Sequence, residues 1–303
     1  MTPPLKGLIA ATFTPMDTAG ELNLDAVPGM VDVLLERRVA GLYVNGTTGE
    51  GPSLTGDERR RTAEAFVRAA ARRVPVLVQV GHNSLGEAKA LAAHAREIGA
   101  FGISATPPGY FKSDSADGLS AVMGEIAGAA PELPFYYYHI PAFGGVAIDM
   151  ADFIEIAGSR IPNFRGVKFS SPTLAEFDRC RRASGGRFDI LFGVDEMLLG
   201  ALAMGAEGAV GSTYNFAAPH YLEMMDAFRQ GRLEDARRLQ SQAVDMVAAI
   251  LEACGRAGLK HAMAISGVDC GVHRLPIEDP SRAQREALAA RLAKLGILES
   301  AAS

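Results

Sequence analysis

GLIAATF (residues 7–13), GLYVNG (41–46) and VPVLVQVG (74–81) are short apolar runs, rich in β-branched residues, and they decide the fold. Between them lie DAVPGMVDVLLERR (25–38) and GDERRRTAEAFVRAAARR (56–73), whose apolar residues follow a helical pattern. Strand-like runs that alternate with helical stretches predict parallel strands joined by crossover helices.

The same alternation continues along the chain and gives eight strand-like segments. They begin near residues 8, 41, 76, 101, 135, 165, 189 and 208. Eight strands with intervening helices predict an α/β fold of the closed (β/α)8 TIM barrel type. An open, doubly wound sheet is the alternative.

The strand pattern stops after Tyr214, and helical stretches follow it. The first of these can complete a barrel, so we expect a barrel domain over residues 1–229. Residues 230–303 are expected to form a helical C-terminal extension, interrupted at Gly255 and Gly258.

Composition excludes several classes of function. The net charge of -5 offers no positive surface for nucleic acid, and no run approaches the roughly 18 apolar residues of a membrane span. The amino terminus lacks a secretory pattern, so we expect a cytoplasmic protein. Cys180, Cys254 and Cys270 are far apart and are expected to be buried, and the six histidines show no metal-ligand spacing. No metal and no organic cofactor is predicted.

Lys168 is the most informative residue. It lies between Val167 and Phe169 at the end of the sixth predicted strand, where the active site of a barrel is expected. Apolar surroundings would lower the pKa of the amine and free its lone pair to attack a ketone, forming an imine. The alternative is a lysine at the edge of the barrel that reaches water with its charged end.

The fifth predicted strand ends in three tyrosines. Tyr136 and Tyr138 share one face by the two-residue period, whereas Tyr137 takes the other face and packs in the core. Tyr138 is the last before the loop, so it is placed to move a proton beside Lys168.

Hydroxyl and carboxyl groups follow three other strands. Thr47 and Thr48 lie in the glycine-rich turn 45–51, which could hold the carboxylate of a 2-keto acid or could simply be a turn. The seventh and eighth strands bring further polar groups that suit a hydroxyl-rich substrate, although Glu196 could equally serve as a charge at a helix start. These are Asp195, Glu196, Ser212 and Thr213.

An ordered set of motifs carries a family resemblance. The motifs are ATFTPMD (11–17), GLYVNGTTGEGPSL (41–54), FYYYHIPAFGGV (135–146), GVKFSS (166–171), LFGVDE (191–196) and GAVGSTYN (208–215). From about residue 5 to residue 275 the chain resembles the superfamily of N-acetylneuraminate lyases and dihydrodipicolinate synthases, which are pyruvate-dependent class I aldolases. Within it, FYYYHIPA and LFGVDE look like the sialic acid aldolases of the animal type.

The resemblance implies roles for individual residues. Lys168 would form the imine, Tyr138 would relay the proton, and Tyr110 would belong to the same relay. Thr47 and Thr48 would hold the pyruvyl carboxylate. The groups that would contact the rest of the sugar acid are Ser170, Gly193, Asp195, Glu196 and Ser212. Gly109 departs from the family, because many relatives carry an aromatic residue there.

Phe143 separates the family members. It stands where the synthases carry an arginine for the carboxylate of their second substrate, and a ring cannot pair with that anion. The resemblance therefore implies cleavage of N-acetylneuraminate to N-acetylmannosamine and pyruvate, without a cofactor, by a homotetramer. The alternatives are an aldolase or dehydratase for another 2-keto-3-deoxy sugar acid, and a non-catalytic barrel that binds pyruvate or sialic acid.

Overall fold

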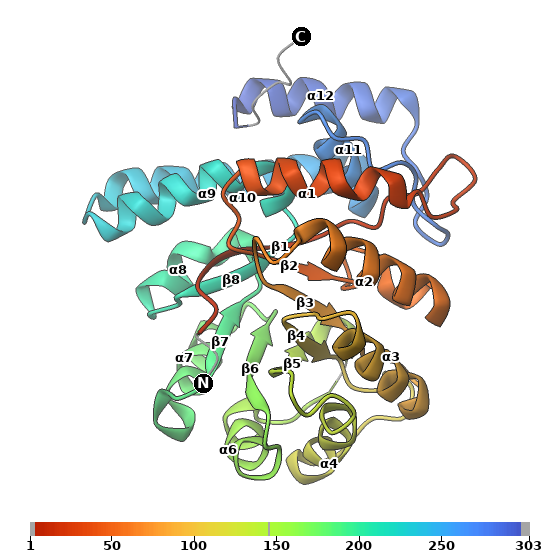
Figure 1. Cartoon of the computed structure of the whole chain (residues 1–303). Helices are drawn as coiled ribbons and strands as arrows, with labels where there is room; N and C mark the ends of the chain where they lie inside the picture. Colours follow the sequence, from red (N-terminus) through yellow and green to blue (C-terminus); the bar gives the residue numbers. More distant parts are fainter. Residues whose placement is uncertain (1–3, 145, 298–303) are drawn as a thin grey trace.

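The chain folds as a closed parallel barrel of eight strands with helices around it (Figure 1). The computed structural model describes residues 4–144 and 146–297. Strand order follows the sequence, and β1 pairs with β8 to close the ring, so the prediction of a barrel is confirmed and the open sheet was wrong. Each strand begins within one residue of its predicted start. The strands are β1 Gly7–Ala11, β2 Gly41–Val44, β3 Val76–Gln79, β4 Gly102–Ala105, β5 Phe135–His139, β6 Phe164–Phe169, β7 Asp189–Phe192 and β8 Gly208–Gly211.

Helices connect the strands and cover the outside of the barrel. They are α1 Val27–Glu36, α2 Gly56–Ala70, α3 Leu85–Glu97, α4 Ala116–Ala127, α5 Pro141–Gly144, α6 Met150–Arg160, α7 Leu174–Arg182, α8 Leu198–Ala203 and α9 Tyr214–Arg229. Local sequence explains their starts: at α2 the Thr55 hydroxyl accepts from the Glu58 N–H, while the Glu58 carboxylate accepts from the Thr55 N–H. Capping of this kind fixes where the loop after β2 ends.

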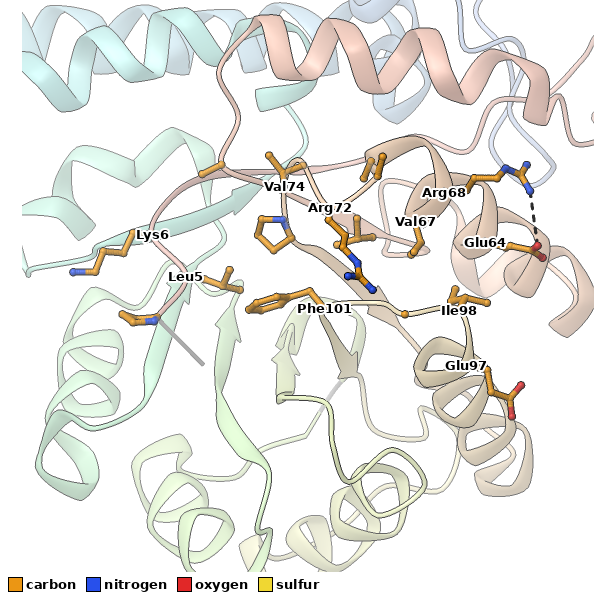
Figure 2. A pocket seen from close by; sticks show the side chains of 17 residues that line it. Leu5, Lys6, Glu64, Val67, Arg68, Arg72, Val74, Glu97, Ile98 and Phe101 are labelled. Carbon is orange, nitrogen blue, oxygen red and sulfur yellow. Dashed lines mark ion pairs between the residues drawn. The ribbon is translucent and has the colours of Figure 1, made fainter. Parts of the chain in front are cut away.

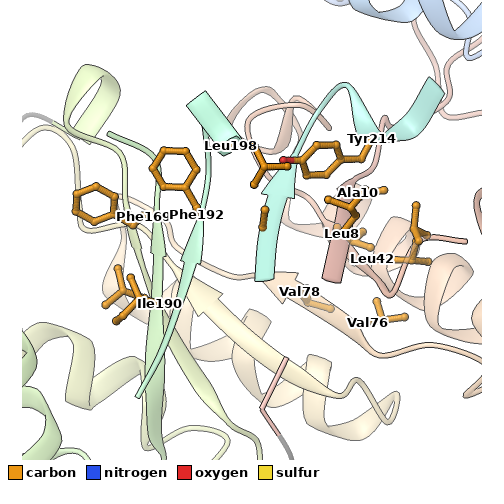
Figure 3. Packing of buried hydrophobic residues seen from close by; sticks show 14 of the residues in the cluster. Leu8, Ala10, Leu42, Val76, Val78, Phe169, Ile190, Phe192, Leu198 and Tyr214 are labelled. Carbon is orange, nitrogen blue, oxygen red and sulfur yellow. The ribbon is translucent and has the colours of Figure 1, made fainter. Parts of the chain in front are cut away.

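Alternating residues of each strand face two separate cores. Figure 3 shows the outer core, where residues such as Leu8, Phe169 and Phe192 lie between strands and helices. Tyr136 and Tyr138 belong to the smaller core inside the barrel, whereas Tyr137 belongs to the outer one. This confirms the prediction from the two-residue period. Cys180, Cys254 and Cys270 are buried, as expected.

The C-terminal extension consists of α10 Leu233–Cys254, α11 Gly258–Ile265 and α12 Arg282–Leu295. Since α9 ends at Arg229, the predicted boundary falls in the turn before α10, although the division into two domains stays a prediction. In residues 4–144 and 146–297, no helix has the length and apolar composition that a membrane crossing needs.

A buried ion pair joins this extension to the barrel. The Lys260 Nζ of α11 lies 3.0 Å from the Glu50 Oε1, and both side chains are only 2% exposed. Lys260 also donates to the Val272 carbonyl at 2.6 Å, and the Arg274 N–H donates to the other Glu50 oxygen at 2.9 Å. The extension therefore contacts the turn that follows β2.

The amino-terminal face of the barrel carries a broad cavity of about 1300 Å³ (Figure 2). Leu5, Val74 and Phe101, which precede three of the strands, line it together with residues at the end of α2. Inside the barrel near this face, the Tyr136 hydroxyl donates to the Asp189 carboxylate at 2.9 Å, and the Arg165 Nε lies 3.3 Å from the same oxygen.

Candidate active site

A second cavity, of about 170 Å³, opens at the carboxyl ends of the strands. Every residue predicted for the site except Tyr110 and Thr213 lines it. These residues are Thr47, Thr48, Tyr138, Lys168, Ser170, Gly193, Asp195, Glu196 and Ser212. They come from the ends of β2, β5, β6, β7 and β8, which converge because parallel strands all end at the same face of a barrel.

Lys168 points into the barrel and is only 4% exposed, which excludes a charged end in open water. Its Nζ lies 3.9 Å from the centre of the Tyr43 ring and 4.0 Å from the centre of the Tyr138 ring. Burial lowers the pKa of Lys168, whereas Tyr138 and Asp195 act in the opposite direction. A lysine in these surroundings is more readily deprotonated than one in water, as a nucleophilic amine requires.

Tyr138 lies between Lys168 and the turn after β2. It pairs in register with Lys168 across β5 and β6, and its hydroxyl is 3.2 Å from the Thr47 hydroxyl. Either hydroxyl can donate, so a proton can pass between them. The Tyr138 side chain therefore contacts both the Lys168 amine, through its ring, and the glycine-rich turn, through its hydroxyl.

The turn after β2 is held in an uncommon backbone conformation. Asn45 and Glu50 have φ angles of 60° and 54°, which non-glycine residues adopt only where their surroundings enforce it. The Gly51 N–H donates to the Gly46 carbonyl at 3.0 Å, and the Thr14 hydroxyl donates to the Gly49 carbonyl at 2.6 Å. These bonds fix the backbone that carries Thr47 and Thr48, while a role of their hydroxyls in binding a carboxylate stays a prediction.

Asp195 is buried at the end of β7 and is held by Thr213, whose N–H donates to its Oδ2 at 3.0 Å and whose hydroxyl lies 2.6 Å from the same atom. Burial raises the pKa of Asp195, and the hydrogen bonds from Thr213 oppose this. Burial also raises the pKa of the half-buried Glu196. Glu196 lies in the short helix Asp195–Met197 and also lines the cavity, and its contact with a substrate stays a prediction.

Glycines at two positions leave room for polar side chains. A Cβ on Gly211 would lie 2.0 Å from the Asp195 Oδ1, and one on Gly193 would lie 2.2 Å from the Ser170 Oγ. Gly193 therefore contributes to the site by leaving room for the Ser170 side chain.

Tyr110 lies outside this cavity. Its side chain is 81% exposed and packs edge-on against Phe111, with ring centres 5.0 Å apart. The N–H of Gly109 donates to the Asn83 Oδ1 at 2.8 Å, so the loop is anchored without a family aromatic. A single chain does not bring Tyr110 to Lys168, and its relay role stays a prediction.

Two contributors were not predicted. Arg256, from the short helix Gly255–Ala257, lines the cavity with its guanidinium 5.1 Å from the centre of the Phe143 ring. Tyr43, the inward residue of β2, contacts the Lys168 amine. For Arg256 the sequence signal was only the pair of glycines that interrupt the helical stretch.

A parallel barrel with a desolvated lysine among hydroxyl groups at its strand ends is the arrangement expected of a class I aldolase, an enzyme that forms an imine through such a lysine. The sequence matches the Dihydrodipicolinate synthetase family over residues 4–295. The chain belongs to this family, which confirms the resemblance.

Individual relatives are similar over nearly the whole chain. N-acetylneuraminate lyase A of Xenopus laevis is 45% identical over 277 residues, which cover 90% of each chain. The structure of N-acetylneuraminate lyase from Proteus mirabilis is 37% identical, with a TM-score of 0.95 over 98% of this chain and 100% of that one. A dihydrodipicolinate synthase of Bacillus anthracis is 26% identical, with a TM-score of 0.89 over 96% and 99% of the two chains.

Proposed function

We propose that this protein is an N-acetylneuraminate lyase, which cleaves N-acetylneuraminate reversibly to N-acetylmannosamine and pyruvate. The observation that carries the proposal is the desolvated Lys168 amine beside the linked hydroxyls of Tyr138 and Thr47. The names of the relatives described above support the choice of substrate.

The reaction begins at the Lys168 amine. Its lone pair attacks C2 of the open-chain substrate, the carbonyl oxygen takes up a proton, and the nitrogen loses one. The resulting hydroxyl is protonated and leaves as water, so that a protonated imine forms with net consumption of one proton. Thr47 and Thr48 hold the substrate carboxylate next to the imine, with Tyr138 supplying and removing protons.

Cleavage of the C3–C4 bond follows. The C4 hydroxyl loses its proton through Tyr138 and the substrate carboxylate, and C4 becomes the aldehyde of N-acetylmannosamine. The electron pair of the broken bond moves into the imine and gives an enamine. Protonation at C3 and hydrolysis then release pyruvate and restore the Lys168 amine.

The remaining polar groups bind the sugar chain. Ser170 lies two residues after the lysine and therefore near the bond that breaks, while Glu196, Ser212 and the Asp195 Oδ1 offer partners for hydroxyl groups. No organic cofactor or metal takes part, because the iminium itself accepts the electrons.

A second candidate is an aldolase or dehydratase for a shorter 2-keto-3-deoxy sugar acid. The cavity volume of about 170 Å³ favours it, since small-molecule pockets usually measure about 300–1,000 Å³. Arg256 also places a positive charge beside Phe143, the position where the synthases carry an arginine. An anionic group of a substrate could therefore bind there, although the Phe143 ring alone would not bind it.

Pyruvate release from N-acetylneuraminate and from 2-keto-3-deoxygluconate distinguishes the two candidates. We expect a higher kcat/KM for N-acetylneuraminate, because a six-carbon acid leaves polar groups without partners at a cost of about 1–3 kcal/mol each. Asp195→Ala should penalise the longer substrate more. Preference for the shorter acid would replace the lyase proposal, and binding without any turnover would support a non-catalytic barrel.

We also propose that the protein acts in the cytoplasm and that it forms a homotetramer, of which the family resemblance implies the second. Sedimentation velocity should then detect a particle of four 32.0-kDa chains. A monomer at micromolar concentration that retains full activity would contradict this assembly.

A further inference from the structure

Tyr43 lies inside the barrel next to the reacting nitrogen. It is fully buried on β2, with its ring centre 3.9 Å from the Lys168 Nζ. Its ring meets that of Tyr138 edge-to-face, with centres 5.7 Å apart, so two rings border the amine. The Tyr43 hydroxyl donates to the Ser104 Oγ at 3.0 Å and is therefore engaged away from the amine.

The turn after β2 fits closely around this ring. A Cβ on Gly46 would lie 2.7 Å from the Tyr43 ring, so only glycine allows the turn to approach it without displacing it. The ring is thus held between the turn that bears Thr47 and the amine of Lys168. Burial raises the pKa of Tyr43 well above its usual value, so the group facing Lys168 is a neutral ring.

The face of an aromatic ring attracts a cation, and the attraction is strongest where water is excluded. A neutral amine gains nothing from it, whereas a protonated imine carries a full positive charge on the same nitrogen. The ring therefore interacts more strongly with the protonated imine than with the neutral amine that attacks the substrate. Differential interaction of this kind accelerates a reaction, unlike uniform binding.

We propose that Tyr43 is a catalytic residue whose ring face stabilises the positive charge on the Lys168 nitrogen in the protonated imine. This inference rests on the proposed function, because it requires that Lys168 form an imine. It gives Tyr43 a role distinct from the proton transfer assigned to Tyr138.

The first test compares Tyr43→Phe, which keeps the ring, with Tyr43→Leu, which removes it. Borohydride traps the imine formed with pyruvate alone, at a pH above the pKa of Lys168, where the resting amine is neutral. Tyr43→Phe should trap within about threefold of the wild type, whereas Tyr43→Leu should lose about 30-fold. The other titratable groups that act on Lys168, Tyr138 and Asp195, are left unchanged in both variants.

The matched control is Tyr136→Leu, which removes a buried ring from the same interior core but away from the cavity. It should destabilise the protein and leave trapping within about threefold of the wild type. Equal losses in Tyr136→Leu and Tyr43→Leu would mean that Tyr43 acts only through packing.

A graded series avoids variants that fail to fold. Phenylalanine with one, two or three ring fluorines at position 43 keeps the shape of the side chain but weakens its attraction for a cation stepwise. Trapping should fall with each fluorine. A flat series overturns the role of Tyr43, whereas absence of any wild-type imine on Lys168 overturns the proposed function itself.

Discussion

Tyr136 and Tyr138 lie two residues apart on the same strand and face the same interior, yet their surroundings differ. At the amino-terminal end, Tyr136 donates to Asp189, which Arg165 also approaches, so the charge there is compensated by permanent partners. At the carboxyl-terminal end, Tyr138 meets a neutral hydroxyl and an amine whose pKa burial lowers. A completed network stabilises the fold, whereas an incomplete one leaves groups available for a substrate.

The cavities at the two ends reinforce this difference. The larger one, of about 1300 Å³, lies at the amino-terminal face and is lined mainly by apolar side chains with surface charges such as Lys6 and Arg72 (Figure 2). The smaller one, of about 170 Å³, holds Lys168 and the residues that surround it. The predicted catalytic residues therefore lie at the carboxyl ends of the strands, although the cavity at the amino-terminal ends is the larger of the two.

The largest expected effect is at Lys168. Lys168→Ala should lower kcat by roughly 10⁴-fold or more, because Lys168 is the one lysine among the described residues that line the cavity. Peptide mass spectrometry after reduction with borohydride and pyruvate should find the label on Lys168 in the wild type. A label on Lys112 or Lys260 would show that the imine forms on another lysine. It would contradict the assignment of the reaction to Lys168 at the carboxyl end of the barrel.

A smaller effect is expected for Tyr138→Phe. It should lower kcat about 10²-fold or more and leave pyruvate affinity within a few-fold, since general acid–base groups contribute about 10²–10⁴. Tyr137→Phe, on the outer face of the same strand, is the control and should alter stability rather than rate. Unchanged turnover in Tyr138→Phe would remove this hydroxyl from the mechanism.

The smallest effect on the reaction is expected for Tyr136→Phe. Loss of the hydrogen bond to Asp189 should reduce the free energy of unfolding by about 1.5–3 kcal/mol, as bonds to charged groups typically contribute that much. Turnover should stay within twofold of the wild type. Urea denaturation and steady-state assays on one preparation measure both quantities, and a large fall in kcat would show that the amino-terminal network also serves catalysis.

The sequence predicted the barrel and most of the candidate site because both depend on local pattern. Period-two alternation assigned Tyr138 to the interior, and the rule that active sites lie at strand ends selected Lys168, Thr47 and Asp195. Lys168 lies on its strand, and Thr47 and Asp195 each lie three residues after the end of theirs, so their places depend on local sequence.

Contacts between distant segments were not predictable in this way. Arg256 reaches the cavity from the C-terminal extension, and its place depends on how that extension packs against the barrel. The contact between Tyr43 and Lys168 depends on where two side chains meet across the barrel, which alternation does not specify. Tyr110 was assigned from family resemblance, and one chain leaves it exposed.

The buried pair of Glu50 and Lys260 has a consequence for synthesis on the ribosome. About 210 residues separate the two, and at 5–20 residues per second roughly 10–40 s pass between their translation. Throughout that interval the Glu50 carboxylate has no counter-charge from α11, and burying it alone would cost several kcal/mol. We therefore expect the turn that carries Thr47 and Thr48 to reach its final form late in synthesis, once α11 can fold against it.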